Sequence, residues 1–425
     1  MNTRLLVAGA GLTALTALFS CNKQPGGVGE RAEGKLVYVL SNDYHDNANA
    51  VWAYKKKADG SLEALPGSPF YTQGAGAGNP KEVLGPDDID DAMIISPDGQ
   101  YLLAVNGGSN TVAVFTIGSN GRLSPVPGSP FPSGGQTPCS IAINGRFVYV
   151  ANKAFDPLHT ITQLPNYVTF TIDGSGHLEQ VPGGKVEVPA GSAPSQVLVS
   201  NDHRFLFATD FLAFMLQGKE PVGTLLSFEL EYTGSLKYAP GSPYVLPSGD
   251  GGALGLAVNP HSQTLYVGFP VASSVGAYSI DPYTGKLTLQ NTVKAGAAAC
   301  WLRTNKAGTR LYVLNSGADA VQVFSTESPN APVSLGTLVL KEPGTTFAVG
   351  ETGTATSSGD FALNLSPDEQ TLYVVSQPTD PNFGDGNSNW LHVLKVAADG
   401  TVSEPTEPLK LPFGADVRST AVVTQ

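Results

Sequence analysis

The chain repeats one short phrase seven times, an apolar strand built around an aromatic-valine pair or a close variant of it. The copies are Leu36–Val39, Tyr101–Val105, Phe147–Val150, Arg204–Phe207, Thr264–Val267, Arg310–Val313 and Thr371–Val374. Successive copies lie about 46 to 65 residues apart, which leaves room for about four short strands in each unit. A four-strand unit repeated in this way predicts an all-β fold, a seven-bladed β-propeller with four-stranded antiparallel blades.

The turns divide each unit into strands. An inner strand ends in a tight turn such as Ser96–Gly99 or Ser366–Glu369, and the repeated phrase forms the second strand. Third strands alternate apolar and polar residues, as in Thr111–Ile117, Gly276–Ile280 and Ala320–Phe324. Three units end in nearly identical five-residue segments, which are Pro66–Phe70, Pro127–Phe131 and Pro240–Tyr244. Proline is tolerated there because the outermost strand of a blade is a sheet edge.

The two ends of the chain complete one blade together. Residues 31–70 contain the last three strands of a blade but no inner strand, whereas Asp416–Val423 is an inner strand with no blade after it. We therefore expect the C-terminal strand to complete the first blade and close the ring.

Long connections fall on one rim of the predicted ring, and the other rim carries only tight turns. The long connections are residues 42–50, 71–90, 152–166, 210–223, 342–359 and 377–389. Long loops gathered on one face of a rigid scaffold favour a binding site on that face, although neutral loop growth would give the same pattern.

The composition argues against a helical fold and against a nucleic-acid-binding protein. The 49 Gly and 32 Pro argue against long helices. The formal net charge of −12 offers no basic stripe for a phosphate backbone, so we expect no nucleic-acid partner.

The N-terminus has the pattern of a targeting segment. Residues 1–20 form a bacterial lipoprotein signal peptide, with an apolar run of about 15 residues that is too short to span a bilayer. Cys21 would carry the lipid, 21–34 would be a flexible tether, and 35–425 the propeller. A plain secretory signal is the alternative. The chain is then expected at the bacterial cell envelope, held to the membrane by a lipid anchor and facing the periplasm or the exterior.

Export permits disulfides, but the mature domain keeps only Cys139 and Cys300. Both fall in inner strands of blades that are not neighbours. Bridged Cα atoms lie within about 7 Å, so we expect two buried thiols and no disulfide.

The seven blades, the Ser-Pro-Asp-Gly turns after inner strands and the Gly-x-Leu starts of outer strands resemble the seven-bladed lactonase family. That family includes propeller-type 6-phosphogluconolactonases and relatives of the muconate lactonizing enzymes. The resemblance covers residues 36–425 and implies the fold and, as an expectation, lactone hydrolysis.

Five positions where the resemblance implies a catalytic His, Glu or Arg hold other residues. They are Gly107, Ser140, Ser195, Trp301 and Ser316. Hydrolysis of a lactone requires a base for water and a donor for the oxyanion. The six histidines are all expected in loops or turns; they are His45, His159, His177, His203, His261 and His392. The catalytic residues are therefore not identified.

Acidic residues gather at the expected mouth of the channel. Asp87, Asp88, Asp90 and Asp91 precede the inner strand of blade two, and Asp250, Asp360 and Asp416 occupy corresponding positions in other blades. Converging carboxylates could bind Ca²⁺ or Mg²⁺, or attract a cationic ligand. Solvated carboxylates on a loop face are the alternative.

Two further segments have open interpretations. Asp210–Leu216 is an apolar connection that could dock a partner, fold over the channel or extend its strand. Asn382–Asn389 is rich in turn formers and is either a flexible loop or a cation site.

Three functions remain from the sequence. The first is a non-catalytic binding or scaffold module that uses its long-loop face for a small neutral ligand. The second is a hydrolase of a sugar or other lactone, in which Asp residues, with or without a metal, replace the missing groups. The third is a structural partner of an envelope protein.

Overall fold

The computed structural model describes residues 35–78, 85–211, 224–246, 252–341, 346–349, 353–356, 358–379, 389–414 and 416–425. Residues 32–425 form one compact unit. The predicted signal peptide, Cys21, the tether, Asp250 and most of the segments 210–216 and 382–389 lie outside the described residues. The described part of the chain contains no helix that is long and apolar enough to cross a membrane.

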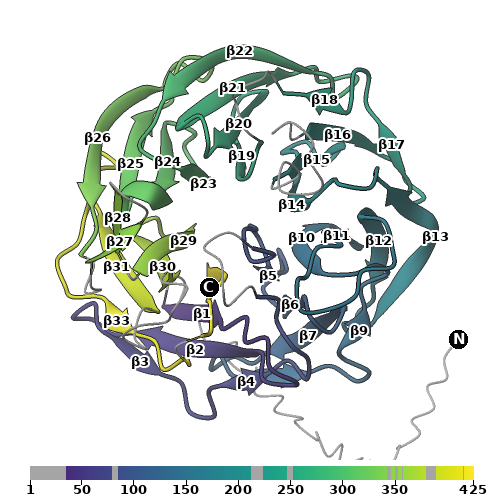
Figure 1. Ribbon diagram of the computed structural model, residues 1–425, viewed down its shortest axis with the longest axis horizontal. Coiled ribbons are helices and arrows are strands. Elements are labelled where there is room, and N and C mark those ends of the chain that lie inside the picture. Colours follow the sequence, from purple (N-terminus) through teal and green to yellow (C-terminus); the bar gives the residue numbers. More distant parts are fainter. Residues whose placement is uncertain are drawn as a thin grey trace, which may run out of the picture. The chain divides into compact units, whose positions relative to one another are not determined.

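Seven antiparallel sheets stand around a central axis as the blades of a propeller, which confirms the predicted fold (Figure 1). Blade one consists of β1 (Leu36–Leu40), β2 (Ala50–Lys56), β3 (Leu62–Ala64), β4 (Phe70–Tyr71) and β34 (Ala421–Thr424). Blade two consists of β5 (Met93–Ile95), β6 (Tyr101–Asn106), β7 (Thr111–Ile117), β8 (Leu123–Pro125) and β9 (Phe131–Pro132). Blade three consists of β10 (Pro138–Asn144), β11 (Phe147–Asn152), β12 (Asn166–Ile172) and β13 (Leu178–Glu187).

Blades four and five are β14 (Pro194–Val199), β15 (Phe205–Asp210), β16 (Thr224–Leu230), β17 (Leu236–Tyr238), β18 (Tyr244–Val245); and β19 (Leu256–Val258), β20 (Thr264–Phe269), β21 (Ser274–Ile280), β22 (Leu287–Lys294). Blades six and seven are β23 (Ala299–Thr304), β24 (Arg310–Asn315), β25 (Ala320–Ser325), β26 (Val333–Val339); and β29 (Ser358–Leu365), β30 (Thr371–Pro378), β31 (Trp390–Val396), β32 (Val402–Ser403), β33 (Leu409–Lys410). The 3₁₀ turn Ser316–Ala318 follows β24.

The ring closes as predicted. β34 pairs antiparallel with β1, in a register that runs from Val37 opposite Thr424 to Leu40 opposite Ala421. The sequence suggested that this strand begins at Asp416, but in the structure it begins at Ala421. The preceding residues leave the sheet, and the side chain of Arg418 lies near Asp87.

The repeated phrase forms the second strand of each blade and is the most deeply buried part of it. Val37 to Leu40 are fully buried, and the equivalent strands are buried beyond their first residue. Two tyrosines in these strands join neighbouring blades: the Tyr38 hydroxyl donates to the carbonyl of Gly121 at 2.9 Å, and the Tyr101 hydroxyl donates to that of Gly174 at 2.8 Å. Each bond joins one blade to the outer turn of the next.

The Pro-Gly-Ser-Pro phrases divide the outer strands of blades one, two and four into two short pieces. In each phrase the serine hydroxyl accepts the backbone N–H of the third strand: Ser68 from Ala53, Ser129 from Val114 and Ser242 from Ser227, at 2.9 to 3.0 Å. The side chain thereby satisfies a backbone donor that a proline-containing strand cannot pair.

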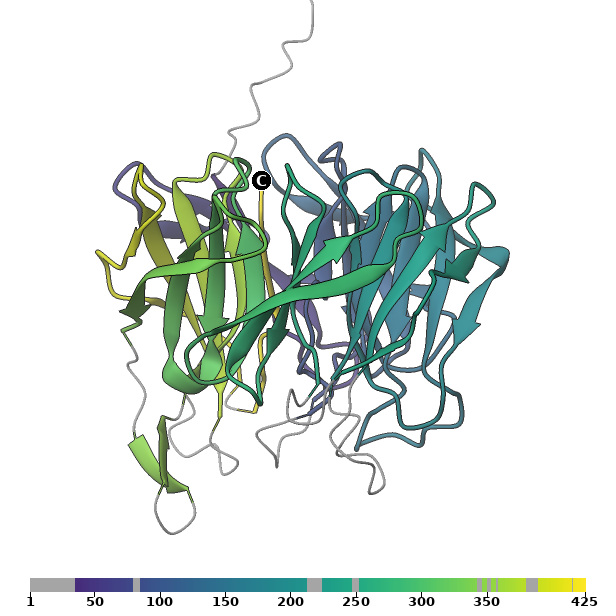
Figure 2. The same cartoon turned by 90° about the horizontal axis from the view of Figure 1, so that it is seen from above.

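The described parts of the long connections lie on one rim (Figure 2). Among them is the hairpin of β27 (Thr346–Val349) and β28 (Gly353–Thr356), which stands between β26 and β29 in sequence. The opposite rim carries the tight turns and the C-terminus. We refer below to the long-loop rim and the tight-turn rim.

Candidate functional site

A short segment of blade two occupies the long-loop end of the channel. This plug, residues 85–91, hydrogen-bonds to three other blades through its backbone. The Asp90 N–H donates to the carbonyl of Ser195 at 3.0 Å, the Ile141 N–H donates to that of Asp91 at 2.9 Å, and Trp301 Nε1 donates to that of Ile89 at 2.7 Å. The channel is therefore closed by the chain itself at this level.

The side chains of the plug enter two clusters. In the first, the Arg303 cluster, Nη1 and Nη2 of Arg303 bind the two oxygens of Asp90 at 2.8 Å each, and Nη2 also binds Asp91 Oδ1 at 2.9 Å. Gln196 Nε2 donates to Asp91 Oδ2 at 2.6 Å, and Gln196 Oε1 accepts the N–H of Leu256. Each oxygen of these two carboxylates thus accepts at least one hydrogen bond.

The second, the Arg418 cluster, consists of Asp87, Gln377 and Arg418. Arg418 Nη1 lies 3.6 Å from Asp87 Oδ2, and both side chains are almost completely buried, at 2% and 0% exposure. Gln377 Nε2 donates to Asp87 Oδ2 at 3.2 Å. Nε, Nη1 and Nη2 of Arg418, Oδ1 of Asp87 and Oε1 of Gln377 have no hydrogen-bond partner in the structure. Such a concentration of unsatisfied buried groups requires a cause.

Asp88, the next residue of the plug, adjoins this cluster. Burial, and next the charge of Asp87, raise the pKa of Asp88 to about 7; Lys153, the Gly85 N–H and Arg418 oppose the shift. The Gly85 N–H donates to Asp88 Oδ2 at 2.7 Å, and Lys153 Nζ donates to the Asp88 carbonyl at 2.8 Å. A carboxylate with a pKa near neutrality is suited to accept a proton from water.

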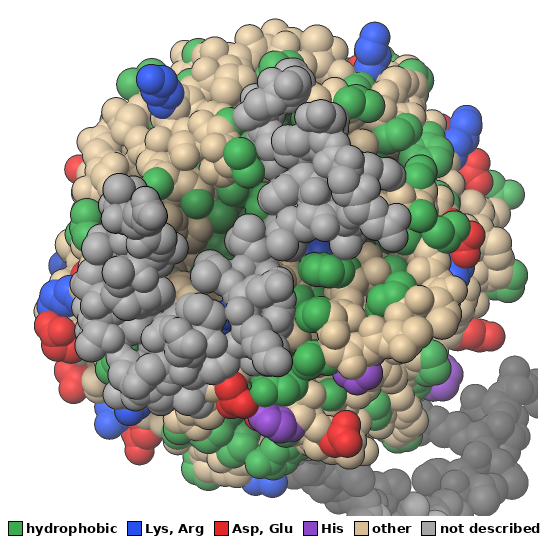
Figure 3. Space-filling model, viewed as in Figure 1, with side chains coloured by type: hydrophobic (Ala, Val, Ile, Leu, Met, Phe, Trp, Pro, Cys, Tyr) green, Lys and Arg blue, Asp and Glu red, His purple; other side chains and the backbone are tan. Residues whose placement is uncertain are grey.

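Of the remaining predicted acidic residues, Asp360 and Asp416 are described by the structure, and neither joins the plug. Asp416 lies on the rim, where the Tyr44 hydroxyl donates to its Oδ2 at 2.7 Å and His45 Nε2 is 3.7 Å away. Acidic side chains that are coloured in Figure 3 lie toward the edge of the long-loop face. No group of three or more His, Cys, Asp or Glu among the described residues is arranged to hold a metal ion.

Asp360 belongs to a buried polar chain inside blade seven. The Ser376 hydroxyl lies 2.9 Å from Asp360 Oδ1 and 2.7 Å from His392 Nε2, and His392 Nδ1 lies 2.8 Å from Glu404 Oε1. Burial raises the pKa of Asp360 to about 7. The expectation that every histidine lies in a loop or turn was wrong, because His392 is in β31 and fully buried.

The five positions that lack the family's catalytic residues are packed against the protein's own backbone. A Cβ on Gly107 would meet that of Ala77 at 2.5 Å. The hydroxyl of Ser140 accepts the Val197 N–H, and Ser195 and Trp301 bind the plug. The Ser316 hydroxyl donates to the Ala298 carbonyl. Two of the five positions, Ser195 and Trp301, therefore contact the plug.

Two other predictions can be compared with the structure. Cys139 and Cys300 are buried free thiols, as expected. Asp210 ends β15, and Phe211 is buried beside Ala193 and Leu254, so the first two residues of the apolar segment continue the strand and the core.

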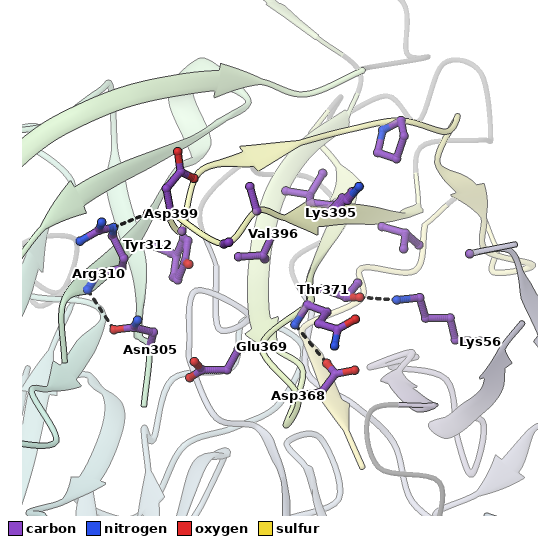
Figure 4. Close-up of a pocket in the computed structure, with 18 of the residues that line it drawn as sticks. Lys56, Asn305, Arg310, Tyr312, Asp368, Glu369, Thr371, Lys395, Val396 and Asp399 are labelled. Atoms are coloured by element: carbon purple, nitrogen blue, oxygen red, sulfur yellow. Dashed lines mark hydrogen bonds between the residues drawn. The ribbon is translucent and has the colours of Figure 1, made fainter. Parts of the chain in front are cut away.

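A cavity of about 770 Å³ lies away from the channel, between blades six, seven and one. At the start of the second strand, blades one to four carry Leu36, Tyr101, Phe147 and Phe205, each packed by the glycine of the neighbouring outer turn. Blade seven carries the smaller Thr371, and no atom lies within 4 Å of a Cβ built on Gly60. Polar groups that line this cavity bind one another: Lys56 donates to Thr371, and Arg310 Nε donates to the Asp399 carbonyl at 2.7 Å (Figure 4).

The sequence analysis missed Arg303, Arg418, Gln196 and Gln377. Arg303 and Gln196 lie in inner strands, Gln377 lies near the end of a second strand, and Arg418 lies just before β34. A search for cations and amides at the channel ends of these strands, in place of a search for His and Glu at the family positions, could have found them.

Comparisons with known proteins agree with the resemblance. The family model described as "Lactonase, 7-bladed beta-propeller" matches residues 33–163 and 253–381, which is more than half of the chain. A curated protein of Arthroderma benhamiae, named "Probable 6-phosphogluconolactonase", is 22% identical over 328 residues, covering 73% of this chain and 76% of that protein.

Two solved structures show the same fold. The periplasmic gluconolactonase of Pseudomonas aeruginosa has a TM-score of 0.62 at 18% identity and covers 91% of this chain and 99% of its own. A protein of Lactobacillus plantarum has a TM-score of 0.60 at 17% identity, with coverage of 92% and 100%.

Proposed function

The chain belongs to the seven-bladed β-propeller lactonase family, and from this premise we propose that it hydrolyses an uncharged, polyhydroxylated lactone of the sugar type. The observation that carries the proposal is the Arg418 cluster, in which buried donors and acceptors stand side by side without partners. The names of the relatives support the same reaction class.

The inventory of unsatisfied atoms selects the kind of ligand. Arg418 offers donors, whereas Asp87 Oδ1 and Gln377 Oε1 offer acceptors. A hydroxyl group both donates and accepts, so a molecule with several hydroxyls satisfies both kinds of group at once. Charge points the same way, because the opposite charges of Arg418 and Asp87 leave no net cation for a phosphate group. An uncharged sugar lactone fits better than a phosphorylated one.

The neighbouring groups supply the chemistry of hydrolysis. Asp88, with its pKa raised to about 7 by burial and by Asp87, takes a proton from water as the water oxygen attacks the lactone carbonyl carbon. The Arg418 guanidinium stabilises the negative charge that develops on the carbonyl oxygen. The ring C–O bond then breaks, the proton passes from Asp88 to the leaving alkoxide, and a hydroxy acid is released.

Lactone hydrolysis measured by acid release at constant pH tests the proposal, with glucono-δ-lactone as the probe. The wild-type chain should accelerate the reaction above the uncatalysed rate, and Asp88→Asn should abolish the acceleration. Arg418→Lys should retain part of the rate that Arg418→Gln loses. Lys237→Gln, an exposed substitution on an outer strand, is the matched control and should leave the rate unchanged.

Two outcomes would overturn catalysis at this cluster. The first is a wild-type rate equal to the uncatalysed rate; if the lactone still raised the unfolding midpoint, the binding module expected from the sequence would be the function. The second is full activity in Asp88→Asn. Repeating the assay with EDTA tests the Ca²⁺ or Mg²⁺ that the sequence suggested, since loss of activity would require a metal.

We also propose that the chain is exported and anchored by a lipid on Cys21, so that the propeller faces the periplasm or the exterior of a bacterial envelope. The support is the signal-peptide pattern of residues 1–20. Growth with a labelled fatty acid should label the wild-type protein and not Cys21→Ser. An envelope protein as partner remains a prediction.

A further inference from the structure

Between the plug and the tight-turn rim, the channel contains a cavity, which we call the shaft. The shaft has a volume of about 610 Å³ and extends from Asp91 and Arg303 to the turn residues Asn201 and His203, so it reaches the tight-turn rim. All seven blades contribute to its wall. Its volume lies within the range of small-molecule sites, about 300 to 1,000 Å³.

The wall of this shaft has two unlike sides. Half-buried residues at or next to the ends of six inner strands line the shaft. In blades two to four these residues are apolar, namely Ile95, Ile143 and Val199. In blades six, seven and one they are polar, namely Thr304, Asn364 and Thr424. The buried hydroxyl of Thr424 has no hydrogen-bond partner in the structure. Such a wall suits a ligand with an apolar body and a polar group.

The floor of the shaft carries an excess of negative charge. Two carboxylates, Asp90 and Asp91, share one guanidinium, that of Arg303. No other Lys or Arg is among the described residues that line the shaft. The side chain of Asp91 is 18% exposed, whereas that of Asp90 is 2% exposed. Each carboxylate oxygen accepts more than one hydrogen bond, so Asp91 retains acceptor capacity toward the shaft.

From this geometry we infer that the shaft binds a small organic cation, an amine with an apolar body, whose ammonium group contacts Asp91 and whose body lies against blades two to four. The ammonium supplies the positive charge that the floor lacks and donates to the free lone pairs of Asp91. The site is separate from the Arg418 cluster and does not depend on the proposed hydrolysis.

The pH dependence follows from the groups at the floor. Burial raises the pKa of Asp91 to about 6, with Asp90 adding to the shift and Arg303 opposing it. His203, at the rim, is the other titratable group of the shaft. The carboxylate form of Asp91 is required, so amine binding should weaken as the pH falls through about 6.

Three probes of nearly equal shape test the inference by calorimetric titration at pH 8: 2-phenylethylamine, 2-phenylethanol and phenylacetate. The amine should bind at least tenfold more tightly than the alcohol, and phenylacetate should bind most weakly. Asp91→Asn should remove the preference for the amine. Val199→Trp, which fills the shaft but leaves the floor intact, should abolish binding of all three.

The inference fails if the alcohol or phenylacetate binds as tightly as the amine. It also fails if a folded Val199→Trp protein still binds the amine with the wild-type affinity, because the amine would then lie elsewhere on an acidic protein. Arg418→Gln serves as the matched control: unchanged amine binding supports a separate shaft site, whereas lost binding would assign the amine to the Arg418 cluster.

Discussion

The two arginine clusters of the channel are built from the same residue types and differ in how completely they are satisfied. In the Arg303 cluster the arginine binds two carboxylates at 2.8 to 2.9 Å, and both ends of Gln196 are bonded. In the Arg418 cluster the closest charged atoms are 3.6 Å apart, and the oxygen of Gln377 has no partner in the structure. Both clusters are held by the same segment, residues 85–91.

The difference separates a structural role from a functional one. A buried ion pair with complete hydrogen bonding holds the plug across the channel, and breaking it leaves charges unpaired in a poorly polarisable interior. A buried arginine without hydrogen bonds costs stability and persists where another molecule completes its bonding. The four predictions below test this division.

The largest effect is expected for Arg303→Met. The substitution leaves the carboxylates of Asp90 and Asp91 buried without their cation, which should lower the free energy of unfolding by about 3–5 kcal/mol. Denaturant unfolding measures the loss. Asp90→Asn combined with Arg303→Met should recover part of it, and a loss below about 1 kcal/mol would contradict the structural role.

For Arg418→Gln we expect a larger effect on activity than on stability. Removing one oxyanion donor is expected to lower kcat about 10²- to 10³-fold, whereas the free energy of unfolding should fall by less than in Arg303→Met, because Arg418 forms one ion pair at 3.6 Å and no hydrogen bond. Parallel measurements of lactone hydrolysis and unfolding test both halves. Unfolding as severe as that of Arg303→Met would remove the distinction between the clusters.

The two glutamines offer a matched pair of smaller effects. Gln196→Leu deprives the Leu256 N–H and Asp91 of partners, so it should destabilise the fold by about 1–3 kcal/mol. Gln377→Leu removes one long bond to Asp87 and an oxygen without a partner. It should leave stability nearly unchanged and raise the KM for the lactone. Equal effects on unfolding would contradict the comparison.

The smallest effect concerns pH and stability. The pKa of Asp91 is raised to about 6 and that of Asp88 to about 7, each chiefly by burial. Since these lie above the unfolded value near 3.9, both groups hold more protons in the folded chain, and the stability that they contribute is greatest below about pH 4 and is lost as the pH rises through 6 to 7. Asp91→Asn or Asp88→Asn should flatten the decline by at most about 1.4 kcal/mol per pH unit.

The sequence was sufficient for the fold because the fold is repetitive. Each copy of the apolar phrase is a local pattern, and the unmatched ends at residues 31–70 and 416–423 required the ring to close. The edge role of the Pro-Gly-Ser-Pro phrases followed from proline chemistry, although the capping by Ser68, Ser129 and Ser242 did not.

The site was only partly predictable. The sequence grouped four neighbouring aspartates, but their partners are Arg303, Arg418, Gln196 and Gln377, more than about 100 residues away in the chain. No local periodicity reports such contacts, and the alternation of a β-strand makes an inward arginine resemble a solvent-facing one. His392 was misplaced for the same reason, because one polar residue within β31 does not reveal that it meets Ser376 and Glu404.

The pairing of Val37–Leu40 with Ala421–Thr424 has a consequence for the order of folding events. It joins residues separated by almost the whole chain, and contacts of this kind form late because a long loop must first be closed. Until then β1 presents an unpaired edge that another chain could take. Blade one is thus the point at which the ring is most open to strand exchange between copies during folding, and the four residues of β34 act as its latch.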